Sequence, residues 1–226
     1  ITLSKDFPNH PFSWKVLGAI FGTTGRKSEA VDANQRVLAL SPKDADAHFN
    51  LGNTLRELGR LEEALTSYSQ AITLNPDFAQ AHYNLGNTFK ELKRLDDALA
   101  SYTKAIALKP DFAQAHYNLG NTLKETKRLD DALASYNQAI ALKPDYAKAH
   151  YNLGNTLKEL GRLDDALASY NQAISLNPDF AEAHSNLGIT LKEIGRLDDA
   201  LASYNQAIAL NPDFAEAHSN LGITLT

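Results

Sequence analysis

The chain of 226 residues contains no cysteine and no methionine. The lack of cysteine excludes a disulfide scaffold, a thiolate zinc site and a thiol nucleophile. It also fits a reducing compartment, and we expect the protein to be cytoplasmic. The lack of methionine indicates that the sequence does not begin at a native start codon, which leaves open whether a targeting segment precedes it.

Long apolar runs and concentrated positive charge are also missing. No apolar stretch approaches the ~18 residues that a membrane-spanning helix needs, so we expect no membrane insertion. Acidic residues number 27 against 22 basic ones, for a net charge of −5, which argues against nucleic acid as a partner. Apolar residues make up 43% of the chain, enough for a folded core.

The sequence carries no recognisable catalytic apparatus. It has no clustered acid, base and nucleophile, no phosphate-binding loop and no dinucleotide fingerprint. Acidic pairs such as Asp164 and Asp165 lie where the first turn of a helix is expected, and helix dipoles favour carboxylates there. We therefore expect no enzymatic activity, no catalytic residue, no metal and no cofactor.

An internal repeat dominates the chain. The string Asn-Leu-Gly recurs every 34 residues, beginning at Asn50, Asn84, Asn118, Asn152, Asn186 and Asn220. Residues 147–180 and 181–214 differ at only five positions. Within each unit, apolar residues recur at spacings of three and four, first in one short segment and then in a second, which predicts two helices per repeat.

This pattern resembles the tetratricopeptide repeat, whose period is 34 residues with two helices per unit. Counting from Ala45 as position 1, the unit carries the preferred residue types at positions 7, 8, 11, 20, 24, 27 and 32: Leu51, Gly52, Leu55, Ala64, Tyr68, Ala71 and Pro76. Histidine at position 4, as in His48, is the consistent departure from the large aromatic residue that the family prefers.

The first 44 residues are divergent but keep the same frame. Trp14, Leu17, Gly18 and Pro42 fall on family positions, whereas Asn34 replaces the aromatic residue at position 24. The expected organisation is a remnant of a preceding repeat, six full repeats and a lone first helix: 1–10, 11–44, 45–78, 79–112, 113–146, 147–180, 181–214 and 215–226.

The fold expected from this resemblance is an all-α solenoid, a right-handed superhelix of antiparallel helix pairs. The resemblance implies that the first helix of each repeat, helix A, lines a concave groove, and that the second, helix B, forms the outer wall. Stacking repeats bury the faces that one hairpin leaves open.

Three local features carry expectations of their own. Gly52, inside helix A, suggests a close approach of another backbone, with Ala64 as the facing residue. Asp77 is expected to cap the next helix A, with Gln80 completing a capping box. Lys93 and Lys127 replace the glycine that ends helix A elsewhere, so those two turns should be strained or differently shaped.

The candidate binding residues lie at positions 5, 6 and 9 of helix A, which face the groove in the family. Their side chains form an asparagine ladder beside aromatic rings, and a carboxamide can both donate to and accept from a peptide backbone. The alternative is that these residues only hold the repeats together. The full set is Asn50, Asn84, Asn118, Asn152, Asn186, Asn53, Asn87, Asn121, Asn155, Phe49, Tyr83, Tyr117 and Tyr151.

Two other kinds of site are weighed and set aside. The clamp by which co-chaperone repeats hold a peptide carboxylate needs a lysine at position 5 and an asparagine at position 9 of the same repeat. Here Lys15 stands at position 5, but position 9 is Ala19. The position-4 histidines recur once per repeat, about 10 Å apart by helix diameter, too far to share a metal. We expect them to pack at the hairpin interface.

Three functions remain in view. The favoured one is a scaffold that binds a protein or an extended peptide in the groove. The second is a substrate-recruiting arm of a larger glycosyltransferase-type enzyme, because the repeats resemble the arm of O-linked N-acetylglucosamine transferases. The third is a self-assembling scaffold, a homo-oligomer joined end to end through its terminal helices.

Overall fold

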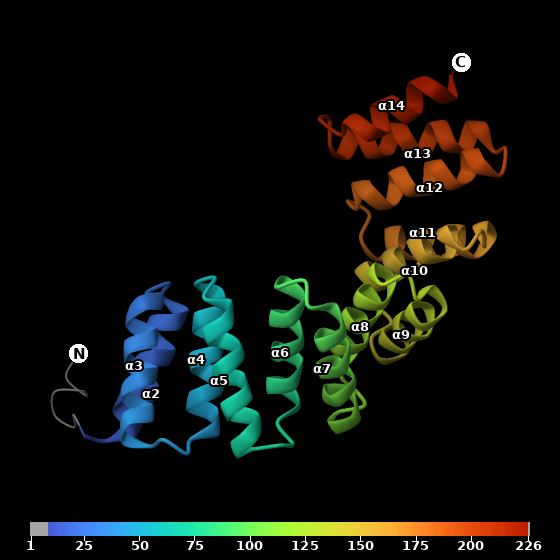
Figure 1. The fold of residues 1–226 in the computed structure, drawn as a ribbon. Helices are drawn as coiled ribbons and strands as arrows, with labels where there is room; N and C mark the ends of the chain where they lie inside the picture. The colour runs from blue at the N-terminus through green and yellow to red at the C-terminus, as the bar shows by residue number, and fades with distance from the viewer. Residues whose placement is uncertain (1–8, 226) are drawn as a thin grey trace. The chain divides into compact units, whose positions relative to one another are not determined.

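The computed structural model describes residues 9–225, and this range contains thirteen α-helices and no strand (Figure 1). The chain divides into two compact units, one ending at Pro110 and the other beginning at Asp111. Residues 1–8, which make up most of the expected remnant 1–10, and Thr226 lie outside the described range.

The first unit contains six helices and the second contains seven within the described residues. The first unit holds α2 (Pro11–Thr23), α3 (Lys27–Leu40), α4 (Ala45–Glu57), α5 (Leu61–Leu74), α6 (Ala79–Glu91) and α7 (Leu95–Leu108). The second holds α8 (Ala113–Glu125), α9 (Leu129–Leu142), α10 (Ala147–Glu159), α11 (Leu163–Leu176), α12 (Ala181–Glu193), α13 (Leu197–Leu210) and α14 (Ala215–Thr224).

Within each unit the helices stack in chain order. Helices pack most extensively in consecutive pairs such as α4 with α5 and α10 with α11. Inside a unit, the second helix of a pair also contacts the first helix of the next, as α5 contacts α6 and α11 contacts α12. This arrangement is an all-α solenoid, as the sequence predicts. None of the helices in residues 9–225 combines the length and apolar character needed to cross a bilayer.

The turn between the helices of a pair needs a left-handed backbone. Gly59 and Gly161 both have φ of 75° there, which costs glycine nothing. Lys93 and Lys127 adopt the same conformation, with φ of 62° and 63°. A side chain in this region is unfavourable by about 1 kcal/mol. The strain expected of these two turns is therefore present.

The glycine of helix A makes room for an aromatic ring. A Cβ atom added to Gly52 would lie 2.7 Å from Cε1 of Tyr68, and the same clash recurs at Gly120 with Tyr136 and at Gly154 with Tyr170. The expectation that Ala64 faces this glycine is wrong. Ala64 is fully buried in the core, but the ring of Tyr68 fills the space above the glycine.

The expected capping box at Asp77 is also wrong. The N-cap residue of α6 is Phe78, one residue later, and its side chain makes no capping hydrogen bond. Asp44 occupies the corresponding place before α4, and its Oδ1 accepts a hydrogen bond from the amide of Ala47 at 3.0 Å. Gln80 instead donates to Oδ1 of Asn84 on its own helix, at 3.3 Å.

Candidate functional site

A fully buried tyrosine on helix B is tied to an asparagine on helix A in each of four repeats. The hydroxyl of Tyr170, with none of its surface exposed, donates to Oδ1 of Asn155 at 2.8 Å. The same bond joins Tyr68 to Asn53, Tyr102 to Asn87 and Tyr136 to Asn121, at 2.8 to 2.9 Å. Each pair is 15 residues apart and fixes helix B on its own helix A.

The same asparagine oxygen also joins neighbouring repeats. Nδ2 of Asn186 donates to Oδ1 of Asn155 at 2.9 Å and to the hydroxyl of Tyr151 at 2.9 Å. Asn152 makes the matching contacts with Asn121 and Tyr117, and Asn84 donates to Asn53 at 2.7 Å. The residues expected at positions 6 and 9 are therefore brought together as a hydrogen-bonded network, and stacking is one of their roles.

This network orients the carboxamides at position 9. Oδ1 of Asn155 accepts from Tyr170 and from Asn186, so both of its lone pairs are occupied. The same holds for Asn121 and for Asn53. Each of these side chains keeps its NH2 group as a donor, that of Asn155 lying beside the Tyr151 hydroxyl, so this row presents donors rather than a mixture of donors and acceptors.

The aromatic residues at position 5 are half-buried, and Phe49, Tyr117 and Tyr151 each pack at a tilted angle between two other rings. The Tyr151 ring centroid lies 4.7 Å from that of Phe180 and 6.1 Å from that of Tyr170. Equivalent contacts hold Tyr117 between Tyr146 and Tyr136, and Phe49 between Phe78 and Tyr68; Tyr83 lies 5.9 Å from Tyr102. One edge of each ring remains at the surface of helix A.

Burial keeps the tyrosine hydroxyls protonated. It raises the pKa of Tyr68 to about 12, partly opposed by the nearby charge of Arg56. Burial also raises the pKa of Tyr102, Tyr136 and Tyr170. Each phenol therefore remains a neutral hydrogen-bond donor at neutral pH.

A row of half-buried cations follows the asparagines by one helical turn. Position 12 holds Arg56 and Lys90 in the first unit and Lys124, Lys158 and Lys192 in the second. Burial lowers the pKa of Lys124, while the carboxylate of Glu159 opposes the shift. Helix A thus presents aromatic, amide and cationic groups along one stripe at positions 5, 9 and 12, hereafter the helix-A face.

The hydrogen-bonded network stops in the last full repeat. Ile189 stands at position 9 and Ser185 at position 5, in place of asparagine and tyrosine. The hydroxyl of Tyr204 and Oγ of Ser185 are both buried without a hydrogen-bond partner. The sequence shows both replacements, but not that a buried hydroxyl would lose its acceptor through them.

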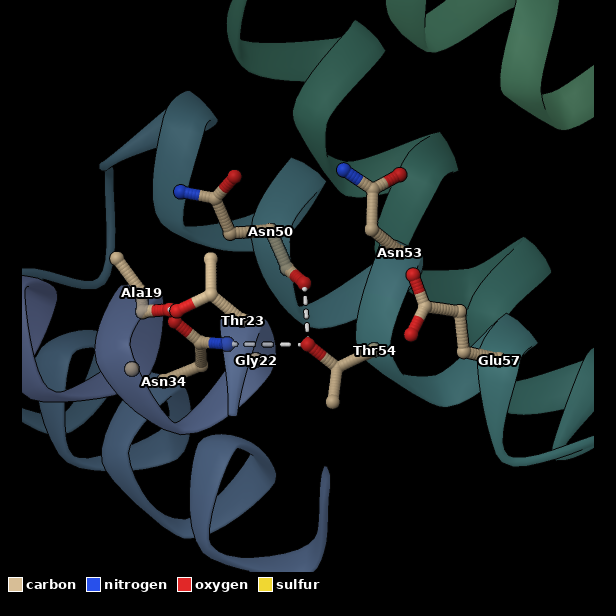
Figure 2. Close-up of a pocket in the computed structure, with 9 residues that line it drawn as sticks. Ala19, Gly22, Thr23, Asn34, Asn50, Asn53, Thr54 and Glu57 are labelled. Carbon is tan, nitrogen blue, oxygen red and sulfur yellow. Dashed lines mark hydrogen bonds between the residues drawn. The ribbon is translucent and has the colours of Figure 1, made fainter. Parts of the chain in front are cut away.

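Among the predicted asparagines at position 6, Asn50 is the exception, and it lies near the N-terminal end of the repeats. Its side chain is exposed and makes no hydrogen bond to the part of the chain that the structure describes, because position 9 of the preceding repeat is Ala19 rather than asparagine. It lines a pocket of about 240 Å³ between α2 and α4 (Figure 2). Asn118 lies half-buried on α8, in line with the other asparagines at position 6.

The position-4 histidines hold the connection that enters helix A. Nε2 of His82 lies 3.1 Å from the carbonyl oxygen of Pro76, and His48, His150, His184 and His218 make the same contact with their own prolines. Burial lowers the pKa of His82, which favours the neutral ring. Among residues 9–225, no three His, Asp or Glu side chains converge to hold a metal.

Family models match most of the chain. The model described as TPR repeat matches residues 52–93, 86–127, 120–161, 154–195 and 190–225, and the model described as tetratricopeptide repeat matches residues 33–66. The chain belongs to the tetratricopeptide repeat family. Proteins of this family are generally scaffolds for protein interaction, with a binding surface built from successive repeats. A comparison with curated protein sequences finds no match.

Solved TPR structures share the fold over most of the chain. YrrB, described as a TPR protein with an unusual peptide-binding site, is 27% identical with a TM-score of 0.73, over 84% of this chain and 98% of that one. MamA is 27% identical with a TM-score of 0.70, over 74% and 97% of the two chains. The structure of pilF from Pseudomonas aeruginosa has a TM-score of 0.81 at 19% identity, over 94% and 97%.

Proposed function

We propose that this TPR protein is a scaffold that binds an extended polypeptide segment along its helix-A face. The observation that carries the proposal is the fixed orientation of the carboxamides of Asn121 and Asn155. Their oxygens are occupied within the protein, so their NH2 groups are left for acceptors of a ligand. The carbonyl oxygens of a peptide backbone are acceptors of this kind, and every peptide sequence has them.

The neighbouring groups suit the same ligand. The half-buried rings of Tyr117 and Tyr151 offer apolar surface that is already ordered, so little side-chain entropy is lost on contact. The ammonium groups of Lys124 and Lys158 lie one turn further along each helix and add donors for carbonyl or carboxylate oxygens. The repeats between residues 45 and 180 each carry this set, and an extended chain likewise repeats its carbonyls.

The network also decides how the proposal must be tested. Replacing Asn155 by alanine would remove the acceptor of the buried Tyr170 hydroxyl and disturb the stack itself. Replacing it by aspartate keeps an oxygen for Tyr170 and Asn186 and converts the remaining NH2 into an acceptor. The double variant Asn121→Asp/Asn155→Asp thus changes the face and keeps the network.

The matched control carries the same two changes on helix B. Asn171 and Asn205 are exposed on α11 and α13, and their change to aspartate adds the same charge away from helix A. A phage-displayed library of random linear peptides is selected on the unaltered protein, and the affinity of the selected peptides is measured for all three proteins.

We expect the selected peptides to bind the Asn121→Asp/Asn155→Asp protein at least about tenfold more weakly, a loss of about 1.4 kcal/mol. The Asn171→Asp/Asn205→Asp protein should bind them as the unaltered protein does. Failure to enrich any peptide, or equal affinity for the unaltered protein and the helix-A variant, would contradict the proposal. Thermal unfolding of each protein verifies that the stack is intact.

A further inference from the structure

The pocket between α2 and α4 lies on the helix-A face of the first unit. Ala19, Gly22 and Thr23 of α2 form one side of it, and Asn50, Asn53 and Glu57 of α4 form the other (Figure 2). Its volume of about 240 Å³ is below the range of sites for drug-sized ligands. It is suited to one side chain rather than a whole ligand.

At the pocket, the first repeat has glycine at position 12, where the next repeat has a cation. Nη1 of Arg56 lies 3.4 Å from Oε1 of Glu91 on the following helix A. The residues 34 positions earlier are Gly22 and Glu57, so glycine stands where the cation would be. Lys27 contacts Glu57 through Oε2, at 3.3 Å, and no other described side chain pairs with Oε1.

An acceptor is missing at the same place. Asn84 donates to Oδ1 of Asn53, but its counterpart Asn50 faces Ala19, which has no polar side chain. Among residues 9–225, the side-chain amide of Asn50 therefore has no hydrogen-bond partner. The NH2 of Asn53 is also left for a ligand, because Oδ1 of Asn53 accepts from Tyr68 and Asn84.

The remaining electrostatics of the pocket favour a positive group. Helices α2 and α4 end at Thr23 and Glu57, so the negative ends of two helix dipoles lie beside the pocket. Lys27 lies on Oε2 of Glu57 and also donates to the backbone carbonyl of Glu57 at 3.3 Å, and Arg56 contacts Glu91, so Oε1 of Glu57 is the carboxylate oxygen left to the pocket. The net charge of −5 attracts basic partners at longer range.

We propose that this pocket binds one basic side chain, an arginine or a lysine, of a polypeptide partner. The cation takes the place that position 12 fills in the next repeat and pairs with Oε1 of Glu57. The backbone carbonyl of the same residue accepts from Nδ2 of Asn50 and replaces the asparagine oxygen that Ala19 does not provide. The inference deepens the proposed function and rests on it for the source of the side chain.

Two variants separate the charge of the pocket from its shape. Glu57→Gln removes the carboxylate and retains its size, and Glu62→Gln, an exposed change on α5, is the control for total charge. Gly22→Lys supplies the missing cation from the protein itself. A Cβ atom at Gly22 meets no other heavy atom within 4 Å, so lysine fits there, and Gly22→Ala controls for the loss of glycine.

The probes are N-acetyl-arginine methylamide and its neutral counterpart, N-acetyl-citrulline methylamide. Binding is followed by NMR through the side-chain NH2 signals of Asn50 and Asn53. Because each probe is one capped residue, it tests the pocket separately from binding along α8 and α10. The experiment therefore distinguishes a protein that binds peptides along the helix-A face but no arginine in the pocket from one that binds arginine in the pocket but no peptides along the face.

We expect saturable shifts at Asn50 and Asn53 with the arginine probe and about fivefold weaker binding of the citrulline probe. Glu57→Gln should remove this preference, and Gly22→Lys should abolish binding. Glu62→Gln and Gly22→Ala should bind as the unaltered protein does. The inference is overturned if the two probes bind equally, if Glu57→Gln changes nothing, or if the signals of Asn50 and Asn53 do not shift.

Discussion

Nδ2 of Asn186 lies 2.9 Å from Oδ1 of Asn155, although the two residues are 31 positions apart in the chain. The same oxygen accepts the hydroxyl of Tyr170, so one acceptor joins α10, α11 and α12. A contact of this kind can hold one repeat in register on the next, because a sideways shift of either helix would break two hydrogen bonds at once. It also fixes which end of the carboxamide remains for a ligand.

The shared acceptor should matter for stability. We expect Asn155→Ala to lower the free energy of unfolding by about 2 kcal/mol, because the buried hydroxyl of Tyr170 would lose its partner. Asn155→Asp keeps an oxygen at this place and should cost much less. Denaturant midpoints of the two variants give the comparison. Equal midpoints would show that the network does not stabilise the stack.

Two buried tyrosines, one inside the hydrogen-bonded network and one beyond its end, should contribute differently to stability. The hydroxyl of Tyr170 has an acceptor, whereas that of Tyr204 is buried without one beside Ile189. Tyr170→Phe should destabilise the protein by about 1 kcal/mol, and Tyr204→Phe should be neutral or stabilising. Thermal unfolding of both variants is the measurement. A larger loss for Tyr204→Phe than for Tyr170→Phe would refute this account.

Two glycines at the same repeat position should respond in opposite ways to alanine. Gly154→Ala places a methyl group 2.7 Å from the ring of Tyr170, and we expect a cost of about 2 kcal/mol from overpacking. A Cβ atom added to Gly222 in α14 would meet no neighbouring atom within 4 Å, so the change of this residue to alanine should stabilise the helix by about 0.5 kcal/mol. Calorimetric unfolding temperatures should therefore move in opposite directions, and a shared direction would contradict the ring-slot role of Gly154.

The buried phenols predict unfolding at alkaline pH. Burial raises the pKa of Tyr68 from about 10 in the unfolded chain to about 12 in the folded one. The folded protein then holds more protons than the unfolded one over this interval, so stability falls as pH rises. This contribution is complete below about pH 10 and is lost as the pH passes through about 12.

Tyrosinate absorbance and circular dichroism, followed together against pH, test that prediction. Ionisation of the buried group of tyrosines should coincide with loss of helix, because these hydroxyls are released only when the stack opens. Tyr68→Phe should weaken the pH dependence over the same interval. Ionisation of every tyrosine near the ordinary pKa, with the helices intact, would show that the phenols are accessible.

Much of the fold could be read from the amino-acid sequence. The 34-residue period and the spacing of apolar residues predict the helix pairs, because each depends only on local periodicity. The sequence predicts a strained or differently shaped turn where lysine stands at positions 93 and 127, and the structure shows that the left-handed form is kept there. The partner of Gly52 was not foreseen, because periodicity identifies a buried face but not which side chain of the facing helix covers it.

For the candidate site, too, one part follows from the sequence and another part only from the tertiary structure. The sequence by itself determined that asparagine, an aromatic residue and lysine share one stripe of helix A, because positions 5, 9 and 12 follow the helical repeat. Only the tertiary structure decided that the carboxamides present their NH2 groups and that Glu57 pairs with Lys27 beside Gly22, where the next repeat pairs Arg56 with Glu91. Both depend on contacts between residues that are 15 to 35 positions apart, and such contacts are set by how the helices pack on one another.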